Sequence, residues 1–225
     1  RAHKWISIKD YILYRFFGEY VTDYSVASAT GLFNLERMDY DEKALNLIGI
    51  PKEKLPRLVS TTHVFQGMDP HWSELTGIPQ DTPFVIGASD GCLANLGIGA
   101  LEPGEVAVTI GTSAAIRTMV DKPLTDPKQR TFCYALADNK WVVGGPSNNG
   151  AILLKWLKEQ IAADIPLDVL LEEAAGTKAG SEGLLCLPYL AGERAPIWNA
   201  NARGVFFGMA LHHKRAHLVR AAMEG

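Results

Sequence analysis

The sequence has few cysteines and no long hydrophobic run. Its 225 residues include only three cysteines, Cys92, Cys133 and Cys186, which are widely spaced and form no CxxC pair. An odd number of separated cysteines in apolar surroundings predicts buried free thiols in a reducing compartment, and it excludes a disulfide framework. No apolar stretch approaches the roughly 20 residues that a membrane-spanning helix needs. No signal peptide is expected either.

The sequence also has no large excess of positive or negative charge and no metal-ligating pattern. With 22 Lys and Arg against 25 Asp and Glu, the formal net charge is −3. No broad attraction to nucleic acid or anionic membrane is therefore expected. His212, His213 and His217 have no ligand partner at metal spacing, so surface or capping roles are expected for them. The composition, 47% hydrophobic and 21% charged, is typical of a soluble globular protein. We expect a cytoplasmic protein that binds small molecules.

Helical and strand patterns alternate along the chain. Hydrophobic spacing predicts a helix over residues 2–17 that ends at Gly18, and further helices at 150–163 and 167–175. Short apolar runs predict strands at 84–88, 105–110, 114–120, 131–137, 141–145 and 184–187, with a hairpin turn at Asp138-Asn139-Lys140. This mixture favours an α/β fold.

Several glycine and proline turn signals lie in residues 59–83, where periodic apolar residues are few. They predict a crossover near residue 80 between two domains, at 1–80 and 81–225. Both ends of the chain lie in helical patterns, so we expect the chain to be part of a longer one.

An aspartate lies in a glycine-rich turn after one predicted strand. Residues 84–99 read FVIGASDGCLANLGIG, so Asp90 stands between Gly87 and Gly91 with little side-chain bulk nearby. A substrate hydroxyl could approach this carboxylate, as general base catalysis requires. The alternative is that Asp90 caps the helix that begins near Cys92. Local sequence alone favours the cap, because caps are common and catalytic bases are rare.

A second turn, Gly111-Thr112-Ser113, joins two predicted strands. Glycine lets the backbone approach a phosphate closely, and the two hydroxyl groups add hydrogen-bond donors. A Gly-Thr turn is more often an ordinary hairpin. Together with Asp90, the turn suggests phosphoryl transfer to an alcohol.

Two further segments contain candidate site residues. GGPSNNG at 144–150 enters a predicted helix and is either a nucleotide contact at the helix N-terminus or a tight turn with an Asn cap, which local sequence favours. In the loop at 188–204, Glu193 and Arg194 form either a structural ion pair or a substrate clamp, and we favour the structural role.

Four segments, read in order, resemble the FGGY family of carbohydrate kinases. They are TDYSVASATGLFN at 22–34, VIGASDGCLANLG at 85–97, TIGTS at 109–113 and GVFFGMALHHKRAHLVRAAME at 204–224. The last resembles the family's C-terminal signature and is the most specific match. Its matching positions are Gly204, Phe206, Gly208, Met209, His217, Leu218, Ala221, Ala222, Met223 and Glu224.

The resemblance implies a two-domain enzyme with the ribonuclease H-like fold of actin and hexokinase. It implies that Asp90 is the general base, which reverses the preference for a cap. It also implies that Gly111 and Thr112 hold ATP phosphate, that Gly145 approaches the nucleotide, and that Tyr24 is a sugar-side aromatic unless it only packs. Mg²⁺ is implied as the partner of ATP. The resemblance is also compatible with a homodimer.

Within the family, the similarity is greatest to gluconate kinases. Gly91 stands where glycerol and xylulose kinases have an amide that would contact a substrate hydroxyl. Gluconate is a carboxylate, so a cation is expected to bind it, but the sequence assigns that role to no residue.

Some parts of the family pattern are missing from the chain. They are the first phosphate loop, the polyol-binding loop and the adenine-side glycine-rich segment. We therefore expect a central slice of a kinase that is inactive alone. Two alternatives remain: a xylulose, ribulose or glycerol kinase of the same family, and a non-catalytic actin-like sensor that binds nucleotide.

Overall fold

The computed structural model describes residues 2–137 and 139–225. The helices are α1 (Ile8–Phe17), α2 (Tyr24–Ser28), α3 (Glu42–Ile48), α4 (Pro70–Thr76), α5 (Asp90–Gly97), α6 (Ile152–Gln160), α7 (Leu167–Ala175) and α8 (Arg215–Glu224), with short 3₁₀ turns η1 (Lys52–Lys54) and η2 (Ser181–Gly183). The strands are β1 (Val21–Asp23), β2 (Phe33–Asn34), β3 (Asp39–Tyr40), β4 (Arg57–Val59), β5 (Val64–Phe65), β6 (Phe84–Val85), β7 (Val106–Ile110), β8 (Ala114–Val120), β9 (Phe132–Ala137), β10 (Lys140–Ser147), β11 (Leu185–Leu187) and β12 (Val205–Phe207).

The chain divides into two compact units. The first contains Arg1–Ala107, Arg117–Thr125 and Phe132–Val143, and the second contains Val108–Ile116, Asp126–Thr131 and Gly144–Gly225. A four-stranded sheet has the order β7-β8-β10-β9, so the division between the units passes through three of its strands. Each unit is described by itself below.

In the first unit, α1 has well-defined ends. The Ser7 hydroxyl accepts the Asp10 N–H, and the Asp10 carboxylate accepts the Ser7 N–H, which together form a capping box. Gly18 ends the helix in the left-handed conformation at φ 73°, as the sequence predicted. Because Ser7 caps the helix, it begins six residues later than the expected range of 2–17.

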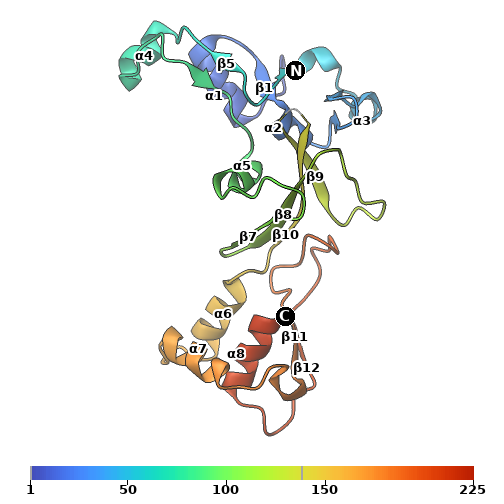
Figure 1. Cartoon of the computed structure of the whole chain (residues 1–225), viewed down its shortest axis with the longest axis vertical. Coiled ribbons are helices and arrows are strands. Elements are labelled where there is room, and N and C mark those ends of the chain that lie inside the picture. The colour runs from blue at the N-terminus through green and yellow to red at the C-terminus, as the bar shows by residue number, and fades with distance from the viewer. Residues whose placement is uncertain (1, 138) are drawn as a thin grey trace. The chain divides into compact units, whose positions relative to one another are not determined.

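The short strand β1 lies next to α1 (Figure 1) and pairs in parallel with β4. Leu13 of the helix packs with Val21, Val59, Phe65 and Ile86 in one core cluster. Burial of apolar side chains of this kind is the main favourable term in folding. The cluster therefore holds α1 and the two strands together.

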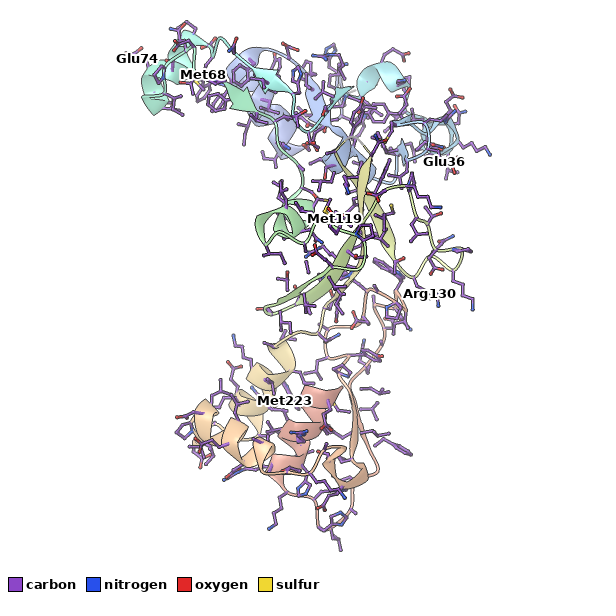
Figure 2. All side chains as sticks on the ribbon, in the orientation of Figure 1. Glu36, Met68, Glu74, Met119, Arg130 and Met223 are labelled. Atoms are coloured by element: carbon purple, nitrogen blue, oxygen red, sulfur yellow. The ribbon has the colours of Figure 1, made fainter. Side chains whose placement is uncertain are left out.

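A second cluster lies beneath α5. Cys92 of the helix packs with Met119 of β8, Leu136 of β9 and Val142 of β10; Figure 2 labels Met119. The helix that carries Asp90 is thus fixed to the sheet by its buried face.

The second unit is built around three helices, α6, α7 and α8 (Figure 1). Leu157, Ala174 and Val219 form one cluster between them. The antiparallel pair β11–β12 pairs Leu185 with Phe207. The structure has α7 at 167–175, as predicted, whereas α6 is shorter than the expected 150–163.

Other expectations can be compared with the structure in the same way. The strand expected at 114–120 is confirmed, but β1 and β12, with three residues each, were missed. Strands β9 and β10 are neighbours, as the expected hairpin requires, while Asp138 lies outside the described residues. All three cysteines are buried and free, as predicted. In the described residues no helix is long and apolar enough to cross a membrane.

Two of the three C-terminal histidines cap backbone groups, which confirms the capping role expected for them. The Nδ1 atom of His217 accepts the N–H of Lys214 at 3.0 Å, at the start of α8. The Nδ1 atom of His213 accepts the N–H of Ala210 at 2.9 Å.

Replacing Met119 tests the cluster beneath α5. Its side chain is 3% exposed, so Met119→Ala should lower the free energy of unfolding by about 2–5 kcal/mol through lost burial and a cavity. Met209 is 61% exposed, and Met209→Ala should change the value by no more than about 0.5 kcal/mol. Urea denaturation followed by circular dichroism measures both, and equal effects would contradict this account of the core.

Candidate active site

The structure distributes the candidate residues between the two units. Asp90 and Tyr24 lie in the first unit, and Gly111, Thr112 and Gly145 lie in the second. Each group is described below together with the residues that surround it.

Asp90 is the first residue of α5, and Ser89 occupies the N-cap position without a side-chain capping bond. The capping role that local sequence favoured for Asp90 is therefore wrong. The Oδ1 atom of Asp90 accepts the N–H of Gly91 at 2.8 Å. This hydrogen bond orients the carboxylate. Because the residue is exposed, the carboxylate is also accessible to a ligand.

The segment before Asp90 is tied to the helix that carries Tyr24. The Ser25 hydroxyl donates to Ser89 Oγ at 3.3 Å and accepts the Ser89 N–H at 3.2 Å. Ser25 is completely buried. The pair fixes α2 beside the first turn of α5, and it brings the segments of two sequence candidates together within one unit.

The position of α2 depends on a buried charge. Asp23 is fully buried and accepts the Val26 N–H at 2.9 Å as the N-cap of the helix. Its Oδ2 atom lies 2.6 Å from Lys9 Nζ. A buried carboxylate is tolerated when it is paired and hydrogen-bonded in this way. The TDYS segment therefore has a structural role in addition to any contact with substrate.

Tyr24 is half-buried. Its ring packs against the cluster of Cys133, Ala135, Trp141 and Val143. This contact gives it a packing role, and its contact with substrate stays a prediction.

In the second unit, the Gly111–Ser113 turn is held by the start of α6. The N–H groups of Gly150 and Ala151 donate to the carbonyls of Thr112 and Gly111 at 3.1 and 2.7 Å. The amides that begin this helix therefore bind the turn itself. All three turn residues are exposed, so the hydroxyl groups of Thr112 and Ser113 are accessible to a ligand.

Gly150 allows this close approach, and Gly145 allows a similar approach to a different loop. A Cβ atom at Gly150 would lie 2.5 Å from the Gly111 carbonyl oxygen, and one at Gly145 would lie 2.7 Å from Cβ of Ala195. Only glycine fits at Gly150 without moving the backbone. The sequence placed Gly150 in the GGPSNNG segment, but nothing there distinguished it from a glycine in an ordinary turn.

A cavity of about 280 Å³ lies beside the turn. Ile110 and Ala114, on either side of the turn, line it together with Gly150, Leu154 and Met223; Figure 2 labels Met223. Its volume is slightly below the range of about 300–1,000 Å³ typical of ligand pockets. An apolar pocket beside exposed hydroxyl groups suits a ligand with a flat apolar part and a phosphate.

Glu193 connects two loops of the second unit. Its carboxylate accepts the Ser147 hydroxyl at 2.8 Å, the Asn148 N–H at 3.0 Å and the Asn149 side-chain amide at 3.0 Å. It also accepts the Arg194 N–H at 2.6 Å. The residue is 5% exposed. Burial alone would raise the pKa of Glu193, but the hydrogen bonds from these groups outweigh it and hold the pKa below its ordinary value.

These contacts overturn one expectation and refine another. Asn149 does not cap α6, whose N-cap is Ala151, because its amide binds Glu193 and the Gly192 carbonyl at 2.7 Å. The structural role favoured for Glu193 is supported, although its partners are loop groups. The Arg194 guanidinium donates to the Ser147 carbonyl at 3.2 Å.

One charged residue near Asp90 was missed in the sequence. Arg117 of β8 places its guanidinium against the backbone of Gly91, so that a Cβ atom at Gly91 would lie 3.3 Å from both Nε and Nη2. No local pattern marks Arg117, because the contact joins a helix to a strand that is distant in sequence.

Solved sugar kinases share this mixed α/β architecture, which is the ATPase fold of actin and hexokinase. The pattern of the FGGY family of carbohydrate kinases, N-terminal domain, matches residues 1–97, and that of the C-terminal domain matches residues 106–225. The chain therefore belongs to the FGGY family of carbohydrate kinases. The expected domain boundary near residue 80 stays a prediction.

Three relatives illustrate the similarity. The gluconokinase of Bacillus subtilis is 53% identical over 235 positions, which cover 100% of this chain and 46% of that protein. Crystal structures described as a gluconate kinase and as a ligand-bound xylulose kinase, both from Lactobacillus acidophilus, are each 42% identical with a TM-score of 0.96. Each match covers 100% of this chain and 46% of the solved one. The chain thus spans about half the length of these relatives.

The lowered pKa of Glu193 predicts a pH effect on stability. Because the folded pKa lies below the unfolded one, the carboxylate should stabilise the fold fully above the ordinary pKa of a glutamate. That stabilisation is lost as the pH falls through the folded pKa. In Glu193→Gln this acid-dependent loss should be absent, as measured by urea denaturation between pH 3 and pH 7. An unchanged pH profile in the variant would refute it.

Proposed function

We propose that this chain is part of an ATP-dependent kinase that phosphorylates a sugar acid, D-gluconate, to 6-phosphogluconate. The observation that carries the proposal is the Asp90 carboxylate, exposed at the first turn of α5 and oriented by the Gly91 N–H. A carboxylate in this position can accept the proton of an attacking hydroxyl. The family assignment supports phosphoryl transfer from ATP as the reaction.

The second unit would bind the nucleotide. Gly111 and Thr112 would contact phosphate through the exposed turn, and Gly145 would allow close approach of the backbone. The cavity beside the turn would receive the base of ATP. Phosphoryl transfer depends mainly on positioning and on neutralising charge, so this unit fixes the donor and Asp90 prepares the acceptor.

A divalent cation, which we propose is Mg²⁺, would accompany ATP. Mg²⁺ keeps several waters and is commonly bound by one or two carboxylates plus substrate phosphates. Such a site needs no cluster of protein ligands, and the structure has no group of three or more metal-ligating side chains in its described part. Bound there, the ion would neutralise charge on the transferred phosphoryl group.

The relatives support gluconate as the acceptor. The gluconokinase of Bacillus subtilis is 53% identical to this chain, and one solved relative is described as a gluconate kinase. The equally similar structure described as a xylulose kinase makes xylulose the second candidate. A substrate panel on the complete kinase separates the two, since each acceptor is assayed by ADP release.

We also propose that the chain needs the rest of the kinase for activity. It spans 46% of the length of the gluconokinase relative, and a kinase must hold donor and acceptor together in a site closed to water. The 225 residues alone should release no ADP with gluconate, whereas the complete kinase should. Turnover by the chain alone would refute this part of the proposal.

Replacing Asp90 tests the general base. In the complete kinase, Asp90→Asn should lower kcat by roughly 10²–10⁴-fold, because the amide cannot accept the hydroxyl proton. ATP affinity, measured by calorimetry, should stay within a factor of about two. Asp81→Asn, at another exposed aspartate, is the matched control. A retained kcat in Asp90→Asn would refute the role of Asp90 as the general base.

Replacing Gly150 tests the phosphate turn. A Cβ atom there would meet the Gly111 carbonyl oxygen at 2.5 Å, so Gly150→Ala should displace the turn and raise the KM for ATP about tenfold or more. Gly176→Ala is the control, since its Cβ atom would meet its nearest neighbour at 3.5 Å. If the turn does not contact ATP, Gly150→Ala should alter stability without changing the KM for ATP.

A further inference from the structure

The backbone conformation at Gly91 does not require a glycine, but a neighbouring side chain takes up the space that a larger residue would fill. Many glycines of this chain have a positive φ, but Gly91 does not, and it lies in the first turn of a regular helix. Glycine in a helix is less favourable than alanine by about 1 kcal/mol. A Cβ atom at Gly91 would lie 3.3 Å from Nε and Nη2 of Arg117 and 3.5 Å from Cζ. The missing side chain therefore leaves room for the guanidinium.

The strand that carries Arg117 is fixed to the same face of α5. Asn95 lies one turn after Gly91 and is fully buried. Its Nδ2 atom donates to the Arg117 carbonyl at 3.4 Å. The helix and the strand are thus joined at the residue whose side chain covers Gly91, so the position of the guanidinium does not depend on a mobile loop.

The guanidinium therefore lies against the residue that directly follows Asp90 in the first turn of α5. We propose that Arg117 binds the carboxylate of a sugar-acid substrate at the Asp90 site, with Gly91 leaving the space for it. This inference rests on the proposed function, because it takes Asp90 as the group that receives the acceptor hydroxyl. Arg117 would supply the cation that a carboxylate substrate requires.

The chemistry of arginine suits this role. Guanidinium is always charged and can bind a carboxylate through two parallel hydrogen bonds. A sugar acid has a carboxylate at one end and a primary hydroxyl at the other, so one ligand can reach both a cation and a base. A neutral polyol has no such group and gains nothing from the cation.

The test compares D-gluconate with D-gluconamide, its neutral amide, in the complete kinase. Calorimetric binding and ADP release are measured for the wild type, Arg117→Met and Arg117→Lys. The wild type should prefer gluconate about 10- to 100-fold, as a charge-assisted hydrogen bond predicts. Arg117→Met should abolish this preference by weakening gluconate alone, and Arg117→Lys should retain part of it.

Variants of α5 provide a second, independent measurement. Gly91→Gln places a long side chain in the space of the guanidinium and should weaken gluconate binding as Arg117→Met does. Gly97→Ala is the matched control on the same helix, because its Cβ atom would meet nothing within 4 Å. This control should leave both ligands unchanged.

The results separate the inference from the proposed function. If the wild type phosphorylates another acceptor and not gluconate, the proposed function fails. If the wild type uses gluconate but Arg117→Met keeps the preference for it, the inference fails alone. An equal loss of kcat on gluconate and gluconamide would also overturn it, because Arg117 would then act on the transferred phosphoryl group.

Discussion

The arrangement of the second unit depends on one buried carboxylate. Glu193 joins the loop after β11 to the segment that leads into α6, and the first amides of α6 hold the Gly111–Ser113 turn. An ionised side chain is stable in a buried position only when donors surround it. The four donors to Glu193 therefore define the conformation of both loops, and through them the shape of the exposed turn.

The first unit uses buried polar side chains in the same way. Asp23 fixes the start of α2, Ser25 ties that helix to Ser89, and Asn95 ties α5 to β8. None of these groups is exposed to a ligand. Each holds an element whose neighbouring residue is exposed, so that the position of Asp90 is set by side chains that take no part in chemistry.

The sequence predicted the helices and strands better than it predicted the contacts between side chains. The helix over 167–175 and the Gly18 helix end followed from periodicity and capping rules, because these depend on neighbouring residues. The cap expected at Asn149 failed because the distant Glu193 takes its amide. Arg117 was missed for the same reason, since its contact with Gly91 joins segments that only folding brings together. The roles of Asp90, Gly111 and Thr112 stay predictions.

The most specific family motif in the sequence contributes mainly to packing, although its Met223 also lines the cavity beside the Gly111–Ser113 turn. In the 204–224 signature, Gly208 has a φ of 84°, and a Cβ atom there would lie 2.7 Å from the Gly183 carbonyl oxygen. Phe206 packs in the core of the unit, and the Glu224 carboxylate accepts the Gly180 N–H at 3.0 Å. The motif identifies the family because the fold requires it. The substrate therefore has to be inferred from less distinctive residues, such as a helical glycine beside an arginine.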